Sequence, residues 1–98
     1  MDNDIITDEN GKMVKDQRNK LDWTLLPWAA MESVVRVLEH GAIKYYRDSW
    51  KKNDPAIYER ALLRHIVAWQ KGEWLDQETS EPHLAHVISN ALFLLEKK

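Results

Sequence analysis

Hydrophobic residues recur at helical spacing in three separate stretches of the chain. The first runs from Pro27 to at least His40, the second from Pro55 to Lys71, and the third from Glu81 to Glu96. Within each stretch the apolar positions lie three or four residues apart, which gathers them on one side of an α-helix. The alternation typical of strands is not seen in the sequence. We therefore predict an all-α fold with three main helices.

Capping residues set the expected ends of these helices. Asp54 is a good N-cap for the second helix, with Pro55 in its first turn, and Gly72 suits its C-terminal end. Ser80 is the expected N-cap of the third helix, just before Pro82. Loops are then expected at about residues 47–53 and 73–79.

The domain organisation follows from the same pattern. Residues 1–20 are polar and are expected to form a flexible or extended leader, whereas residues 21–98 form a single helical domain. Three helices with broad apolar faces leave hydrophobic surface uncovered in so short a chain. We therefore expect a homo-oligomer, a dimer or larger, that completes a helical bundle.

Composition narrows the function classes. A net charge of −2 argues against a binder of nucleic-acid polymers that works by neutralising phosphates. Without cysteine the chain has no disulfide framework and no Cys-type zinc site, which favours a cytoplasmic location. No apolar run reaches the roughly 18 residues of a membrane span, so no membrane partner is expected.

The predicted third helix carries a polar stripe of His83, His86 and Asn90, at positions i, i+3 and i+7. Two imidazoles one turn apart can bind one metal ion or one phosphate. Mn²⁺, Zn²⁺ or Co²⁺ would suit two histidines better than Mg²⁺, which prefers oxygen ligands. The alternative is that these histidines lie at the edge of the core and bind only solvent or backbone.

Carboxylates occur at two further places. Glu32 and Glu39 flank Arg36 on the first helix, where they either hold a divalent ion or form a solvated, salt-bridged face. Glu73 and Asp76 form an E-x-x-D pattern in the second loop, and two nearby carboxylates can hold Mg²⁺.

Basic residues offer two candidate phosphate sites. Arg60 and Arg64 share a face of the second helix, where they either recognise phosphate or pair with nearby glutamates. The first loop is basic around Trp50 and could hold a nucleotide by charge and stacking, or merely be a soluble loop with one buried Trp. Its basic residues are Lys44, Arg47, Lys51 and Lys52.

Short blocks follow one another in order from Asn19 to Lys98, about four fifths of the chain. They are Leu21-Asp22, Leu25-Leu26-Pro27, Glu32, Arg36-Val37-Leu38, Gly41-Ala42-x-Lys44-Tyr45, Trp50, Ala61-x-x-Arg64-His65-x-x-Ala68-Trp69, Gly72-Glu73-x-x-Asp76, His83-Leu84-Ala85-His86 and Asn90-x-x-Phe93-Leu94-Leu95-Glu96. This succession resembles the family of dATP/dGTP diphosphohydrolase N-terminal domains, found in phages and bacteria and related to MazG-like all-α nucleotide pyrophosphohydrolases.

The resemblance implies a MazG-like helical fold that oligomerises. It also implies an enzyme that cleaves a deoxynucleoside triphosphate, a purine one, to the monophosphate and pyrophosphate with a divalent metal, Mg²⁺ or Mn²⁺. MazG-like enzymes supply E-x-x-E from one helix and E-x-x-D from a later one. This chain departs from that pattern, since Val35 follows Glu32 at the second acidic position and His83-x-x-His86 replaces the later acids.

The resemblance further suggests roles for individual residues. The expected catalytic residues are Glu32 and His86, and the expected metal ligands are Glu32, Glu73, Asp76 and His86. Lys44, Arg64 and His83 are expected to contact phosphates, and Trp50 or Trp69 to face the base. Tyr45, His65 and Asn90 complete the expected substrate-binding set.

Two other functions use the same residues. A phage protein with a depleted acidic set could bind nucleotides without cleaving them, and so sequester nucleotide second messengers in the cytoplasm of its host. A structural helical oligomer with merely solvated polar stripes would need no nucleotide at all.

Overall fold

Three α-helices carry most of the chain in a computed structural model, which describes residues 5–15 and 18–97. The elements, in order, are β1 (Ile5–Thr7), β2 (Met13–Lys15), the 3₁₀ turn η1 (Trp23–Leu25), α1 (Trp28–Lys44), the 3₁₀ turn η2 (Ser49–Lys51), α2 (Pro55–Gln70) and α3 (His83–Glu96). The mainly helical class and all three predicted helices are confirmed. Among the described residues, no helix combines the length and the hydrophobicity needed to cross a membrane.

The prediction that the chain has no strands is wrong for residues 5–15, where β1 and β2 pair as an antiparallel hairpin. The hairpin depends on its turn. Asp8 Oδ1 accepts hydrogen bonds from the backbone N–H groups of Asn10 (2.9 Å) and Lys12 (2.8 Å), and Gly11 adopts φ +77°. An Asn-Gly pair beside β-branched residues is a known hairpin signal. The extended form expected for the leader is thus a paired hairpin here.

Local capping places α2 where the sequence predicts it. Asp54 Oδ1 accepts a hydrogen bond from Ala56 N at 3.0 Å, and Pro55 occupies the first helical turn. At the other end Gly72 takes φ +94° and donates its N–H to Trp69 O, which ends the helix. A positive φ is easy only for glycine, so this position fixes the direction in which the chain leaves α2.

Ser80 is not the N-cap of α3, and this prediction is corrected. Ser80 has φ +60° and belongs to the turn before the helix, where its N–H donates to Asp76 O. The helix begins at His83, after Pro82. Within the described part of the chain no side chain caps α3, and the hydrogen bond from Glu81 N to Thr79 Oγ1 (3.2 Å) stabilises the turn before it.

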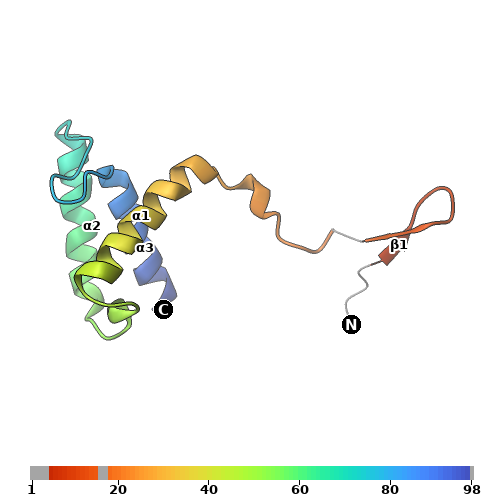
Figure 1. The fold of residues 1–98 in the computed structure, drawn as a ribbon, viewed down its shortest axis with the longest axis horizontal. Helices are drawn as coiled ribbons and strands as arrows, with labels where there is room; N and C mark the ends of the chain where they lie inside the picture. Colours follow the sequence, from red (N-terminus) through yellow and green to blue (C-terminus); the bar gives the residue numbers. More distant parts are fainter. Residues whose placement is uncertain (1–4, 16–17, 98) are drawn as a thin grey trace.

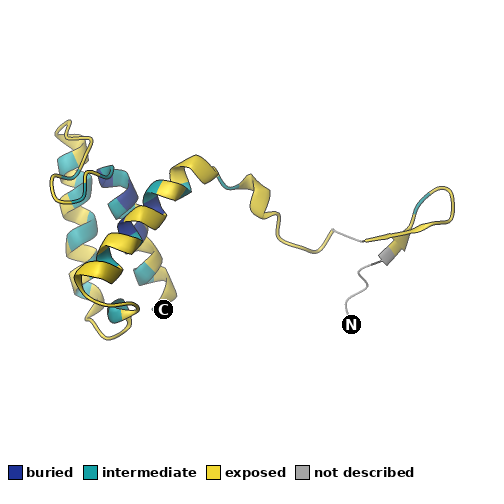
Figure 2. Ribbon diagram, in the orientation of Figure 1, coloured by how far each residue is buried: buried dark blue, intermediate teal, exposed yellow. Residues whose placement is uncertain are grey.

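α3 packs against both α1 and α2, and the core lies where α1 meets α3 (Figures 1 and 2). Val34 and Val37 from α1 and Ala85 from α3 are buried, with Met31 and Leu38 packed at their edge. The polar residues His83, Ser89 and Asn90 of α3 are buried as well. The helices therefore enclose a small apolar centre and a polar layer beside it.

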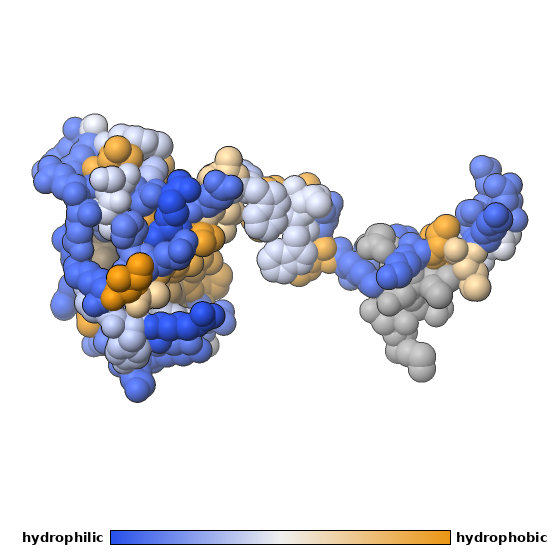
Figure 3. Space-filling model, viewed as in Figure 1, coloured by the Kyte–Doolittle hydropathy of each residue, from blue (hydrophilic) through white to orange (hydrophobic). Residues whose placement is uncertain are grey.

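The molecule is elongated, with a radius of gyration of 19.2 Å. A compact chain of this length would have about 13 Å. The hairpin lies at one end of the long axis and the helices at the other (Figure 1). Hydrophobic side chains remain on the surface of the helices and on the segment leading to them (Figure 3), among them Leu25, Ile43 and Leu95. The homo-oligomer stays a prediction.

The core predicts a sharp contrast between two adjacent valines. Val34 is 1% exposed and Val35 is 49% exposed. Val34→Ala should lower the free energy of unfolding by about 2 kcal/mol, because it removes two buried carbons and leaves a cavity. Val35→Ala, the matched control, should change it by less than about 0.5 kcal/mol. Urea denaturation measures both, and equal effects would contradict the placement of the core.

Candidate functional site

Three histidines meet where α2 crosses the first turn of α3. His65 projects from α2, while His83 and His86 lie three residues apart on α3 and so share one side of that helix. The rings of His65 and His86 stack with centroids 4.3 Å apart and an interplanar angle of 11°. The Nδ1 atoms of His65 and His83 share a hydrogen bond of 2.8 Å. The interface between these helices is therefore built from imidazoles as well as from apolar side chains.

Asp76 reaches the histidines from the turn between α2 and α3. Its Oδ1 lies 4.0 Å from His65 Nδ1, and its Oδ2 lies 3.8 Å from His86 Nε2. The carboxylate accepts hydrogen bonds from the backbone N–H groups of Glu78 and Thr79, at 3.1 and 2.9 Å, and from the hydroxyl of Thr79 at 3.2 Å. Thr79 Oγ1 also lies 2.7 Å from His86 Nε2. Thr79 therefore orients both Asp76 and His86.

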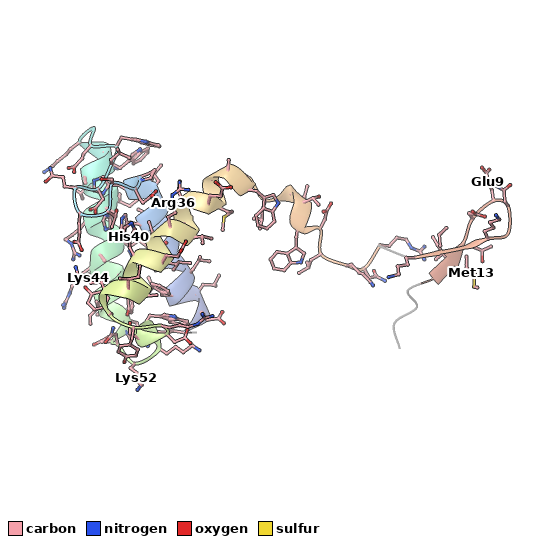
Figure 4. All side chains as sticks on the ribbon, in the orientation of Figure 1. Glu9, Met13, Arg36, His40, Lys44 and Lys52 are labelled. Atoms are coloured by element: carbon pink, nitrogen blue, oxygen red, sulfur yellow. The ribbon has the colours of Figure 1, made fainter. Side chains whose placement is uncertain are left out.

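The turn that carries Asp76 is tied to α1 as well. Arg36 Nε donates to Glu81 Oε1 at 2.7 Å, and Lys44 Nζ forms an ion pair of 2.6 Å with Glu78. Arg36, His40 and Lys44 follow one another along one side of α1 (Figure 4). Within the turn, Asp76 N donates to Glu81 O at 2.8 Å. All three helices thus contribute to the position of the Asp76 carboxylate.

The site holds neutral imidazoles beside an ionised carboxylate. The pKa of His65 is lowered to about 4, chiefly by burial and also by the neighbouring His86, against the opposing effect of Asp76. Burial likewise lowers the pKa of His86. Burial alone would raise the pKa of Asp76, but the hydrogen bond from Thr79 N and the adjacent histidines outweigh it and lower that pKa. Near neutral pH both imidazoles therefore have a free electron pair on nitrogen, and Asp76 carries the negative charge.

His65, Asp76 and His86 can offer one ligand atom each, and these three atoms all lie within 4.8 Å of one another. Ligands on opposite sides of a transition-metal ion lie about 4.2 Å apart, twice a typical metal–ligand distance. Small side-chain movements would therefore bring all three atoms onto one ion. Two imidazoles and one carboxylate are a donor set that suits Mn²⁺, Zn²⁺ or Co²⁺.

His83 adds a third, buried imidazole to this cluster. Its Nε2 is a buried atom without a hydrogen-bond partner among the described residues. Glu73 Oε1 lies 3.3 Å from it, outside hydrogen-bond geometry, on a side chain that is 43% exposed. A buried polar nitrogen without a partner is costly unless a ligand or water satisfies it. Glu73 therefore lies at the exposed edge of the cluster, next to His83.

The structure thus brings together five of the residues singled out in the sequence, namely His65, Glu73, Asp76, His83 and His86. It does not bring Glu32 to them. The Glu32 side chain is 75% exposed on α1, 3.8 Å from Arg36. Asn90 is buried, and its side chain donates to His86 O at 2.8 Å, one turn further along α3.

The expected substrate-binding residues are spread over the surface. Lys44 pairs with Glu78 beside the turn, and Tyr45 is exposed at the end of α1. Trp50 stacks on Phe93 with ring centroids 5.0 Å apart. Phe93 also contacts Tyr58, which lies near the start of α2. Tyr58 precedes His65 by seven residues, or about 10 Å along the helix. Arg64 and Trp69 are exposed on α2.

Thr79 and Glu81 are the site residues that sequence reasoning missed. Thr79 follows Asp76 by three residues, and aspartate side chains often bind the backbone N–H groups two or three residues on. That local signal was present in the sequence. The pairing of Glu81 with Arg36 spans 45 residues and has no counterpart in the local sequence.

Comparison with known proteins gives two findings. The model of the family described as "dATP/dGTP diphosphohydrolase, N-terminal" matches residues 10–98. A protein of Salmonella phage PMBT28, described as a dATP/dGTP diphosphohydrolase, is 31% identical over 81 residues, which cover 83% of this chain and 28% of that protein. The chain thus spans less than a third of that relative's length. No solved structure matches it.

The lowered pKa of His65 predicts a loss of stability in mild acid. Its pKa is about 4 in the folded protein and 6.5 for the unperturbed side chain, so between these values the unfolded chain binds more protons. The free energy of unfolding should therefore fall as the pH drops from about 6.5 to about 4, and His86 acts in the same direction. The lowered pKa of Asp76 matters only below its usual value of 3.8.

Urea denaturation in EDTA at about pH 7.5 and about pH 5 measures this loss. His65→Gln should reduce the pH dependence, whereas Glu59→Gln, at an exposed position on α2, should keep that of the unaltered protein. An unchanged pH dependence in His65→Gln would show that another group causes the acid lability.

Proposed function

Because the chain belongs to the family of dATP/dGTP diphosphohydrolase N-terminal domains, we propose that it hydrolyses a purine deoxynucleoside triphosphate to the monophosphate and pyrophosphate. The observation that carries this proposal is the convergence of His65, Asp76 and His86 from α2, the turn and α3. Hydrolysis of a phosphoanhydride requires charge neutralisation and an oriented water more than covalent participation by the protein. A convergent metal-binding set meets the first requirement.

A divalent metal at His65, Asp76 and His86 belongs to this proposal. The donor atoms favour Mn²⁺ over Mg²⁺, because two of the three are imidazole nitrogens. When bound, such an ion neutralises charge on the phosphoryl oxygens and acidifies a bound water. Both imidazoles are already neutral near pH 7, so they bind metal without first losing a proton.

The residues around the donors have supporting roles. Thr79 holds the Asp76 carboxylate with its backbone N–H and hydroxyl, and it contacts His86 Nε2. Such contacts keep ligands in a fixed orientation. Glu32 has no part in the proposal, since it is exposed and lies beside Arg36.

We assign Glu73 as the general base that accepts the proton of the attacking water. The water oxygen forms a bond to the α-phosphorus while the bond from that phosphorus to the pyrophosphate oxygen breaks, and the proton passes to a carboxylate. Glu73 is partly exposed and 3.3 Å from the unpartnered His83 Nε2, so its carboxylate lies beside the cluster and is accessible to water. A general base of this kind contributes about 10²–10⁴-fold.

The proposal predicts a loss of activity on a minimal change of Asp76. Asp76→Asn keeps the shape of the side chain and removes its charge, so release of pyrophosphate from dATP or dGTP with Mn²⁺ should fall by about 100-fold or more. Glu59→Gln is the control, because Glu59 is exposed on α2 outside the cluster. Equal turnover in Asp76→Asn and the unaltered protein would remove the metal assignment. A nucleotide that is bound and recovered intact after denaturation would favour sequestration over hydrolysis.

Metal removal gives a second prediction, which does not depend on turnover. Mn²⁺ should raise the melting temperature of the unaltered protein, because a ligand that binds only the folded state stabilises it. EDTA should reverse the rise. In Asp76→Asn the rise should be absent, while Glu59→Gln should keep it. A shift of equal size in Asp76→Asn would place the metal elsewhere.

A further inference from the structure

A shallow, open groove runs along the outer side of α2 and ends at the turn beside the histidine cluster. The space along it measures about 770 Å³ and is widely open to solvent. The residues that line it are Arg60, Leu63, Arg64, Val67, Ala68, Lys71 and Glu73. Six of them belong to α2 or to the residue that follows it. The groove is therefore a feature of one helix face and of the first residues of the turn.

Three of these residues are cations for which the described part of the chain offers no acidic partner. Among the described residues, no carboxylate forms an ion pair with Arg60, Arg64 or Lys71, although carboxylates pair with Arg36, Lys44 and Lys51 elsewhere on the molecule. The sequence had left open a partnership of Arg60 and Arg64 with nearby glutamates, and residues 5–15 and 18–97 provide none. Neighbouring like charges on one helix face repel one another. An anion bound between them would relieve that repulsion.

The floor between the cations is apolar. Leu63 and Val67 are 54% and 45% exposed, and both line the groove together with Ala68. A cationic rim over an apolar floor matches a ligand with charged phosphates and a less polar sugar and base. Arginine side chains present several N–H donors in a fixed plane, which suits phosphate oxygens.

The groove is joined to the candidate metal ligands at two points. Arg64 immediately precedes His65 on α2, so one residue faces the groove and the next faces the cluster. At the end of the groove, Glu73 lies 3.3 Å from His83 Nε2, and His83 in turn shares a hydrogen bond with His65. Because Glu73 is acidic, it marks the limit of the anion-binding part.

We propose that the groove binds the polyphosphate of a nucleotide, with Arg60, Arg64 and Lys71 as its phosphate-binding residues. The proposal rests on the hydrolase function above and gives it a substrate site. Arg60 and Lys71 are eleven residues apart, or about 16 Å along a helix, so a bound nucleotide lies along α2. Its phosphates lie among the long side chains of the three cations, and its less polar part covers Leu63 and Val67.

The basic loop around Trp50 is the competing site, and its contacts argue against it. Trp50 stacks on Phe93, and Lys51 Nζ lies 5.7 Å from the centroid of the same Trp50 ring. Lys51 also pairs with Asp48 at 3.7 Å. The Trp50 ring and the Lys51 charge therefore already have partners within the protein. The three cations of the groove have no acidic partner among the described residues.

The test measures binding without turnover. Tripolyphosphate and dATP are titrated by calorimetry, in EDTA, into the full chain, into the double variant Arg64→Gln/Lys71→Gln and into Lys12→Gln, which removes the same type of charge from the distant hairpin. The double variant should bind both ligands at least about 10-fold more weakly, because two charge-assisted hydrogen-bond donors to phosphate are removed. Lys12→Gln should bind like the unaltered protein. The single variant Arg60→Gln should weaken binding in the same direction, and circular dichroism confirms that each variant is folded.

Several results would overturn the proposal. They are unchanged binding in the double variant, a loss of binding caused instead by Lys51→Gln, and no binding of either ligand to the unaltered protein. Weakened binding of dATP together with unchanged binding of tripolyphosphate would also exclude a phosphate role for these residues. The two proposals can fail separately. If the protein is inactive but binds tripolyphosphate through Arg64 and Lys71, the groove proposal stands and the hydrolase proposal is refuted. If the protein is active and its KM for dATP is unchanged in the double variant, the hydrolase proposal stands and the groove proposal is refuted.

Discussion

The packing of His65, His83 and His86 between α2 and α3 is the constraint on which the rest of the structure depends. The apolar centre is small and lies on the other side of α3, where Val34, Val37 and Ala85 meet. The α2–α3 contact must therefore include imidazole rings, and burial favours the neutral form of His65 and His86. The His65 and His86 rings stack with centroids 4.3 Å apart, where two protonated imidazoles would repel each other. The neutral form of His65 and His86 also leaves an electron pair on a ring nitrogen that could bind a metal ion.

The position of the carboxylate depends on the turn, and the turn depends on α1. Exposed ion pairs such as Lys44–Glu78 contribute little stability on their own. The Glu81 side chain in the pair with Arg36 is only 13% exposed, so water weakens this pair less than a surface pair. Its main effect is on position, because Glu81 O accepts the N–H of Asp76. The contact of Arg36 with Glu81 thus helps to position the Asp76 carboxylate, which faces α2 and α3.

The parts of this molecule that could be predicted from sequence are those set by neighbouring residues. Asp54 and Gly72 define the ends of α2 because capping acts within a few residues, and helical spacing placed His83 and His86 on one face. The convergence with His65 could not be predicted in this way, since it depends on how α2 crosses α3. The prediction of Ser80 as the N-cap of α3 was wrong because it considered only the residue type. The hydrogen bonds of Asp76 place Ser80 inside the turn before the helix. The relation to MazG-like enzymes stays a prediction.

α2 determines how a phosphate ligand and the candidate metal donors are related in space. Successive residues of a helix point about 100° apart, so Arg64 and His65 face different sides of the same rigid element. A ligand along the groove would keep a fixed register with His65, whatever small movements the turn makes. Asp76, by contrast, belongs to the turn, and its 3.8–4.0 Å separations from the imidazoles leave room for closure. Under the two proposals, the helix would fix where the substrate lies, and the turn would supply the carboxylate of the metal site beside it.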